Sequence, residues 1–247
     1  MVSKDVLYLP SGDTALTVQF GTTISITLNN LVLGLGALVQ DADINGVVAT
    51  LPTYRSLLIN YDPLVISQQD LITQLEPLVM RLDDPSALPE SANSKSWQIP
   101  ICFDDEFSPD LGHVSDQLGI NSSEVINAFL DAEFHIYMLG FAPGQPYMGG
   151  LPEAMSVPRR KDPVPQIPKG SLVTATGMAI IYPVANPTGW HVMGRTPVEL
   201  FNIDRDPAII LSPGDKVHLT QIDRAEYEDI LDQTTHGTFD LARLSTS

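Results

Sequence analysis

The sequence has almost no cysteine and no long apolar run, and both absences narrow what kind of protein it encodes. Cys102 is the only cysteine among 247 residues, so no internal disulfide can form. With only five scattered histidines beside it, the chain shows no zinc motif and we expect no metal site. No apolar stretch approaches the roughly 20 residues that span a bilayer. The first residues, MVSKDVLYLPSGD, lack the features of a signal peptide, so we expect a cytoplasmic protein.

Basic residues are also scarce, and their distribution is uneven. The chain holds 13 Lys and Arg against 30 Asp and Glu, a formal net charge of -17, which argues against nucleic acid or an anionic membrane as partner. Residues 140–198 nevertheless carry five bases against two acids, so this segment is +3 and the remainder is -20. The segment is either a solvated face or a site for a phosphate or carboxylate. Its bases are Arg159, Arg160, Lys161, Lys169 and Arg195.

Two common catalytic motifs are missing. No G-x-x-x-x-G-K-[ST] loop occurs, so any ATP must bind without a Walker motif, at a subunit interface in our interpretation. No G-x-S-x-G nucleophile elbow occurs either. Cys102 lies in an apolar segment that predicts a strand, where an inert buried thiol is expected.

Residues 1–84 predict an α+β domain. VLYLPSGDTALTVQF has the alternation of a β-hairpin, and from Thr22 the period changes to that of an amphipathic helix. Two strands are expected around residues 52–54. Ser67 with Asp70 predicts the start of a second helix, which Pro77 should kink. Strands, helix, strands and helix in this order indicate a ferredoxin-like sandwich.

The rest of the chain predicts a linker, a β-barrel and a tail. Residues 85–96 are polar and are the expected linker. Residues 97–225 contain a strand, two short helices and then many short apolar segments separated by turns, which indicates a mainly β barrel or sandwich. Residues 226–247 are expected to form a weak helix followed by a disordered tail.

A series of motifs in the barrel region resembles a known family. The motifs GFAPGQPYMGGL, PRR, IPKGS, IYP and NPTGWHVMGRTPVELF occur in this order. They are similar to those of the KipI or allophanate-hydrolase-subunit-1 family, which includes the PxpB subunit of prokaryotic 5-oxoprolinase and is related to the carboxyltransferase region of urea carboxylase. The resemblance extends from about residue 5 to about residue 222. It implies a ferredoxin-like domain followed by a cyclophilin-like β-barrel.

The resemblance also implies a function in a complex. One expectation is a subunit of an ATP-dependent amidohydrolase that opens 5-oxoproline to glutamate, with a KipA/PxpC-like partner and a LamB/YcsF (PxpA-like) protein. The alternatives are a KipI-like histidine kinase inhibitor and a subunit related to allophanate hydrolase or urea carboxylase. The sequence departs from the family pattern at Phe129, Gln145, Val164, Lys169, Met178, Ala179 and Thr188.

A stretch rich in glycine and proline is the first candidate site. Seven of the thirteen residues from Gly140 to Pro152 are Gly or Pro. The stretch is either a barrel crossover or a rigid, aromatic-lined wall built by Phe141, Gly144 and Tyr147. The two arginines that follow should point to opposite faces of an extended segment, and the resemblance favours Arg159 as the one in the site.

The remaining candidates lie in later loops and strands. Lys169, Ser171 and Tyr182 occur at loop–strand junctions, where Lys169 could neutralise an anion. In WHVMGRT, simple alternation places His191 and Arg195 on one strand face, a possible polar pair for an anionic substrate or a proton transfer. Trp190 falls on the opposite face by the same alternation. We interpret Trp190 as a core residue.

Overall fold

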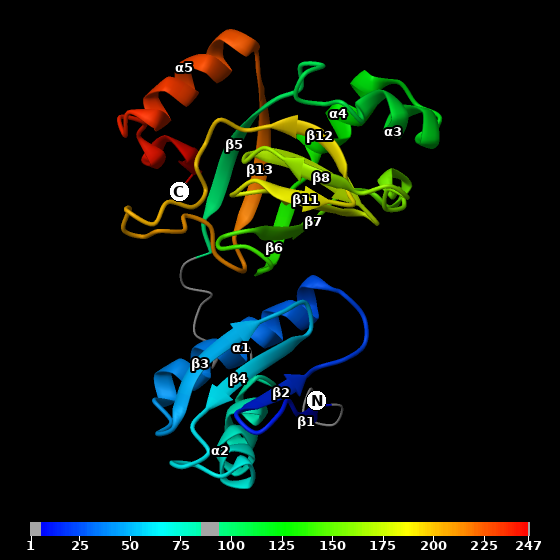
Figure 1. Ribbon diagram of the computed structural model, residues 1–247. Coiled ribbons are helices and arrows are strands. Elements are labelled where there is room, and N and C mark those ends of the chain that lie inside the picture. Colours follow the sequence, from blue (N-terminus) through cyan, green and yellow to red (C-terminus); the bar gives the residue numbers. More distant parts are fainter. Residues whose placement is uncertain (1–5, 85–93, 247) are drawn as a thin grey trace. The chain divides into compact units, whose positions relative to one another are not determined.

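The computed structural model describes residues 6–84 and 94–246, and the chain divides into two compact units, Met1–Ser94 and Lys95–Ser247 (Figure 1). Most of the predicted linker, residues 85–93, lies outside the described residues. The first strand of the second unit, β5 (Ser96–Cys102), begins at the last residue of the predicted linker.

The N-terminal unit is a two-layer α+β sandwich, as predicted. Its antiparallel sheet has the order β1 (Leu7–Pro10), β2 (Ala15–Gln19), β4 (Ser56–Tyr61) and β3 (Val47–Pro52). Helices α1 (Ile26–Ala42) and α2 (Gln68–Arg81) follow β2 and β4 in the chain. The order of a ferredoxin-like sheet is preserved, but the edge strand beside β2 is the N-terminal β1 rather than a strand after α2.

The two helices begin where their caps place them. The Ser25 side chain accepts a hydrogen bond from Leu28 N, so α1 starts at Ile26 rather than at Thr22. The predicted cap of α2 is confirmed, because Ser67 Oγ accepts from Asp70 N at 3.1 Å. Helix α2 continues through Pro77 to Arg81. Apolar side chains from both helices pack with Leu16, Val18, Leu57 and Ile59 of the sheet.

The C-terminal unit is the predicted β-barrel. Seven strands of an eight-stranded sheet close in the order β12, β9, β10, β7, β6, β13 and β5, and β5 pairs back to β12. Their bounds are His191–Arg195, Ser171–Ala175, Met178–Ile181, Pro146–Gly149, Phe134–Leu139, Lys216–Ile222 and Ser96–Cys102. A separate ribbon is formed by β8 (Val164–Ile167) and β11 (Asn186–Thr188). A short 3-10 helix, η3, spans Glu153–Met155.

The barrel closes through a narrow seam between β5 and β12. The one residue pair that joins these strands is Arg195 with Cys102. Asp110, which precedes helix α3 (Leu111–Leu118), occupies the neighbouring part of the β12 edge. Its N–H donates to Val192 O at 3.2 Å, and its Oδ2 accepts from Val192 N at 2.7 Å. Helix α4 (Ser122–Asp131) packs beside α3 and against β13. Cys102 is fully buried, as expected, and burial raises the pKa of its thiol.

The prediction of a disordered tail is wrong. Helix α5 (Arg224–Thr235) is followed by a 3-10 turn, η4 (Leu241–Leu244), and a short strand, β14 (Ser245–Thr246), that pairs with β5. The reason is burial, since Tyr227, Ile230 and Leu244 join the barrel core. Across the described ranges, 6–84 and 94–246, no helix combines the length and apolarity that a membrane crossing requires.

Candidate functional site

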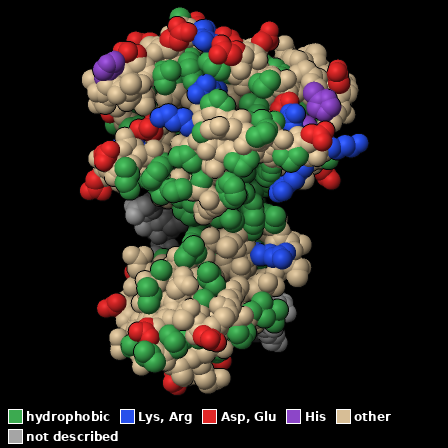
Figure 2. All heavy atoms as spheres, viewed as in Figure 1, with side chains coloured by type: hydrophobic (Ala, Val, Ile, Leu, Met, Phe, Trp, Pro, Cys, Tyr) green, Lys and Arg blue, Asp and Glu red, His purple; other side chains and the backbone are tan. Residues whose placement is uncertain are grey.

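One face of four neighbouring barrel strands carries three of the predicted site residues, Tyr147, Ser171 and Arg195. Tyr147, Ile180, Val173 and Val192 stand side by side across β7, β10, β9 and β12. They pack with Tyr182, Trp190 and residues of β8, so we call this surface the ribbon face. The opposite face of the same strands supplies Met148, Leu172, Ala179, Ile181 and Met193 to the barrel core. Figure 2 shows hydrophobic side chains on the side that carries β8 and β11, with basic side chains at its border.

One end of the ribbon face is aromatic. Gln145 Nε2 donates to the Tyr147 hydroxyl at 3.4 Å, and Tyr182 donates to Thr188 Oγ1 at 3.2 Å. Thr188 Oγ1 also accepts from Trp190 N at 3.0 Å, so Thr188 ties two of the aromatic residues together. Burial raises the pKa of Tyr147, and Tyr182 raises it further, whereas the hydrogen bond from Gln145 and the charge of Arg159 lower it. With the pKa raised overall, Tyr147 is a neutral phenol at physiological pH.

The two adjacent arginines separate at this end. The Arg159 guanidinium lies 5.6 Å from the centroid of the Trp190 ring. The Arg160 guanidinium instead forms an ion pair with Asp110, and the backbone N–H of Arg160 donates to Gly189 O. Among residues 6–84 and 94–246, Arg159 has no carboxylate within ion-pair distance, so its charge is available to a ligand at the aromatic end.

The other end of the ribbon face opens into a pocket of about 370 Å³ between the barrel and α5. Arg195 lines it together with Lys169, Asn202, Tyr227 and Thr234, among others. Arg195 Nε donates to Lys169 O at 3.0 Å. Lys169 Nζ lies 3.0 Å from Glu199 Oε1 and is thereby neutralised. Of the described residues that line the pocket, Arg195 is the basic one without a carboxylate partner.

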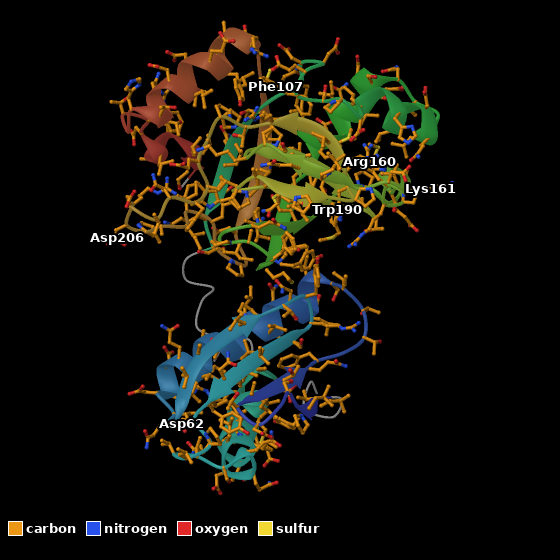
Figure 3. The ribbon with its side chains drawn as sticks, viewed as in Figure 1. Asp62, Phe107, Arg160, Lys161, Trp190 and Asp206 are labelled. Atoms are coloured by element: carbon orange, nitrogen blue, oxygen red, sulfur yellow. The ribbon has the colours of Figure 1, made fainter. Side chains whose placement is uncertain are left out.

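Phe107 holds the Arg195 side chain in place. Its ring centroid lies 5.6 Å from the Arg195 guanidinium and 4.5 Å from that of Arg224. Arg224 is neutralised by Glu106 and Glu228, each at 2.7 Å, so Arg195 carries the unbalanced charge at this ring. In Figure 3, Phe107 lies on the α5 side of the barrel unit, and Trp190 and Arg160 lie away from it. The sequence carries no pattern that would have singled out Phe107.

The predicted pairing of His191 with Arg195 is wrong. A β-bulge shifts the register of β12 between Val192 and Gly194. His191 therefore stands opposite Thr174, while Arg195 stands opposite Ser171 on the ribbon face. His191 is 2% exposed, and its Nε2 lies 3.0 Å from Pro158 O. Its ring centroid is 5.5 Å from that of His113, and the structure gives no shared contact between His191 and Arg195.

The other candidates occupy separate positions. Ser171 is buried, and its hydroxyl donates to Pro168 O at 2.8 Å. Phe141 is 74% exposed at the tip of the β6–β7 hairpin. Gly144 has φ 72, and a Cβ at this position would lie 3.2 Å from the Ile209 side chain. The wall of Phe141, Gly144 and Tyr147 stays a prediction.

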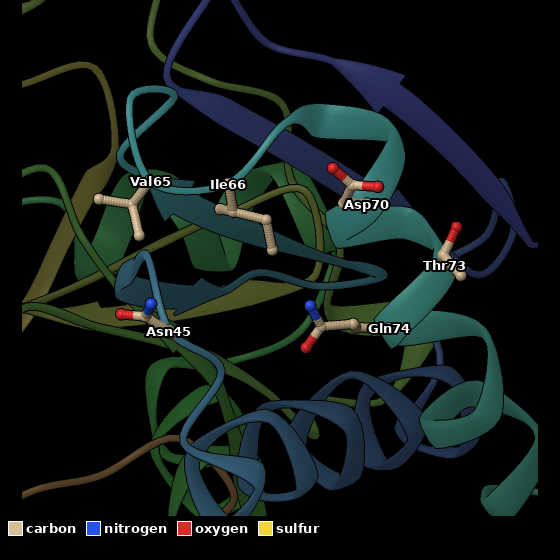
Figure 4. A pocket seen from close by; sticks show the side chains of 6 residues that line it. All are labelled: Asn45, Val65, Ile66, Asp70, Thr73 and Gln74. Carbon is tan, nitrogen blue, oxygen red and sulfur yellow. The ribbon is translucent and has the colours of Figure 1, made fainter.

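A second cavity lies in the N-terminal unit (Figure 4). It measures about 390 Å³ and is lined by Asn45, Val65, Ile66, Asp70, Thr73 and Gln74. Asp70, the charged residue among them, already accepts a hydrogen bond from Ser67 Oγ in the helix cap. The cavity offers no base to an anion, so we place the candidate site on the ribbon face. Within residues 6–84 and 94–246, no three His, Cys, Asp or Glu side chains gather as metal ligands.

Comparison with known proteins assigns the family. The model of the carboxyltransferase domain, subdomains C and D, matches residues 6–211. The chain belongs to this family. The 5-oxoprolinase B subunit of Bacillus subtilis (strain 168) is 32% identical over 224 residues, which cover 87% of this chain and 92% of the relative. The 5-oxoprolinase B subunit of Escherichia coli O157:H7 is 29% identical over 207 residues, covering 83% and 91%. The resemblance read from the motifs is confirmed at family level.

Two solved structures illustrate the similarity of fold. A conserved uncharacterized protein of Pyrococcus horikoshii has a TM-score of 0.53 and 32% identity, covering 90% of this chain and all of that one. The urea amidolyase of Kluyveromyces lactis has a TM-score of 0.78 over 98% of this chain, but this chain covers only 16% of that enzyme. At 20% identity the second likeness concerns the fold alone. Helix α5, one wall of the Arg195 pocket, lies beyond the residues that the family model matches.

Proposed function

We propose that this carboxyltransferase-family chain is the B subunit of an ATP-dependent 5-oxoprolinase. The observation that carries the proposal is the match to proteins that bear this name, two of which are covered over 92% and 91% of their own length. The name implies a multi-subunit enzyme. The partners we propose are a KipA/PxpC-like protein and a LamB/YcsF (PxpA-like) protein.

The reaction is the hydrolysis of a five-membered lactam. Water adds to the lactam carbonyl carbon, the ring C–N bond breaks, and the nitrogen leaves as the amine of glutamate. The amide is stable in water, and ATP supplies the phosphoryl group that makes its carbonyl reactive; ADP and phosphate are the other products. Because the chain has no Walker motif, we place the ATP phosphates mainly on a partner subunit.

In this proposal the Arg195 pocket holds the substrate carboxylate. Its volume of about 370 Å³ is in the range of small-molecule sites. One guanidinium without a protein carboxylate matches one ligand carboxylate, which it can bind in a bidentate manner. A triphosphate carries several negative charges and would meet Glu199 in the same pocket, which makes the pocket less suited to ATP. Arg195 is therefore assigned to substrate binding.

The test is reconstitution of the enzyme from this chain and its genomic partners. Glutamate and ADP are measured from 5-oxoproline and ATP, with a control that omits only this chain. We expect activity that depends on the chain. An assembled complex without oxoprolinase activity contradicts the proposal. Turnover of allophanate or urea by that complex would favour the carboxylase-related alternative, and suppression of histidine kinase autophosphorylation by this chain alone would favour the KipI-like one.

A further inference from the structure

Helix α5 turns one of its faces toward the Arg195 pocket. The residues of the helix that line the cavity are spaced as one side of an α-helix requires, and they are Tyr227, Leu231, Thr234 and Thr235. The family model matches residues 6–211 and does not reach α5, so membership of the family does not explain this wall. Because Arg195 lines the same cavity, a ligand held by Arg195 also meets the side chains of α5.

Tyr227 is buried, yet its hydroxyl has no partner in the fold. The residue is 3% exposed, and its ring packs in the barrel core beside Phe107, with the two ring centroids 4.5 Å apart. Within the part of the chain that the structure describes, no group forms a hydrogen bond with the Tyr227 hydroxyl. This oxygen is also not one of the fully buried polar atoms that lack a partner, so it is accessible from the cavity that Tyr227 lines. A ligand in the cavity can therefore use the hydroxyl as a donor.

Phe107 brings this hydroxyl close to the Arg195 guanidinium. The guanidinium lies 5.6 Å from the centroid of the Phe107 ring, the same ring that packs on Tyr227. Burial raises the pKa of Tyr227, and among the neighbouring charges that of Arg195 acts most strongly and lowers this pKa in part. With its pKa raised overall, the phenol keeps its proton at physiological pH and can donate it to an acceptor. A guanidinium and a phenol at one cavity are together complementary to a carboxylate.

We propose that Tyr227 is a substrate-binding residue, whose hydroxyl donates a hydrogen bond to the substrate carboxylate that Arg195 neutralises. The inference rests on the proposed function, which supplies 5-oxoproline as the ligand. The two oxygen atoms of a carboxylate can accept from both donors at once. Leu231 lines the same cavity with 37% of its surface exposed and offers an apolar contact to the methylene groups of the ring. The pocket thus selects a small ligand with one carboxylate and an apolar body.

The experiment measures binding of 5-oxoproline to the purified full-length chain by saturation-transfer NMR. Tyr227→Phe removes the hydroxyl and keeps the ring that packs on Phe107. We expect the Kd for 5-oxoproline to rise about ten-fold or more, with an unchanged Tm because the hydroxyl has no partner in the fold. The uncharged 2-pyrrolidinone, the same ring without the carboxylate, should bind more weakly and equally to wild type and variant. The control is Tyr61→Phe, since Tyr61 is 4% exposed in the N-terminal unit and should leave the Kd unchanged.

Each of four results would overturn the inference. An unchanged Kd for Tyr227→Phe would show that the hydroxyl does not contact the ligand. An equal rise of the Kd for 2-pyrrolidinone would assign the hydroxyl to the lactam ring rather than to the carboxylate. A lower Tm of the variant would show that the hydroxyl bonds within its own chain. Absence of 5-oxoproline binding by the wild-type chain would contradict a carboxylate site in this pocket.

Failure of the proposed function gives a different result. If the chain binds 5-oxoproline through Tyr227 but the reconstituted complex does not hydrolyse it, the inference holds and the proposed function alone is contradicted.

Discussion

Replacement of the buried Asp215 should strongly destabilise the barrel unit. Asp215 is 1% exposed, and both of its carboxylate oxygens accept hydrogen bonds. Oδ1 accepts from Lys95 N at 2.8 Å, and Oδ2 accepts from Trp97 Nε1 at 2.8 Å and from Ser212 N at 2.9 Å. One carboxylate thus joins the start of β5 to the turn before β13, the two parallel strands next to the seam.

The magnitude follows from these three bonds. Hydrogen bonds to a charged group contribute about 1.5–3 kcal/mol each. Asp215→Ala leaves the three donors without their acceptor but also removes the cost of burying the carboxylate. We therefore expect a net loss of about 3–5 kcal/mol in the free energy of unfolding. Asp215→Asn keeps the shape of the side chain but replaces one carboxylate oxygen by an NH2 group, which then faces an N–H donor. The free energy of unfolding should fall by about 2 kcal/mol.

The assay is denaturant unfolding followed by tryptophan fluorescence. The two tryptophans, Trp97 and Trp190, both lie in the C-terminal unit, so their signal reports the barrel even if the two units unfold separately. Asp105→Ala, at an exposed position, is the matched control and should change the midpoint little. A loss below about 1 kcal/mol for Asp215→Ala would show that the three hydrogen bonds contribute little to the stability of the barrel.

Three further predictions concern the site and the pH dependence. In the reconstituted enzyme, Arg195→Ala should raise the KM for 5-oxoproline by about 10- to 100-fold, and Lys169→Ala much less; equal effects would contradict the assignment. Phe107→Leu should raise that KM by several-fold through loss of about 0.5–2 kcal/mol of cation–π contact, whereas Phe239→Leu, outside the pocket, should not. Burial lowers the pKa of His135, so the unfolded state binds a proton at a higher pH than the native state does. The free energy of unfolding should therefore fall as the pH drops below about 6.5. His135→Gln should flatten that fall in denaturation midpoints between about pH 7 and pH 5, and an unchanged slope would refute it.

The sequence predicts the elements whose stability comes from local patterns. The cap at Ser67, the helical stripes and the alternating strands depend on neighbours within a few residues, and these predictions agree with the structure. Many short strands separated by turns predict a barrel or a sandwich, and the family resemblance favours the closed barrel that the structure shows. In the candidate site, the basic residues of the segment could be found from composition, and Lys169 and Arg195 do line one pocket.

The features that the sequence does not predict arise from contacts between distant segments. The bulge in β12 has one weak local signal, the glycine within the strand. Gly194 is needed because a Cβ there would lie 2.7 Å from Ile101 Cγ2, a neighbour almost a hundred positions away. The sequence does not predict the ordered tail, because most residues of the tail are polar. Its few apolar residues become buried only when the tail packs on the barrel at β5.

The same long-range contacts explain why Arg195, rather than Lys169, should dominate ligand binding. Arg195 sits at the closing pair of the barrel, between Ser171 and Cys102, and its Nε is bonded to a backbone oxygen. The Lys169 side chain is 57% exposed and held by Glu199. To bind an anion, Lys169 must leave that carboxylate and lose about 0.5–1.5 kcal/mol of side-chain freedom. The guanidinium of Arg195 is already held by the Lys169 carbonyl and the Phe107 ring, so a ligand carboxylate can bind it without a further loss of side-chain entropy.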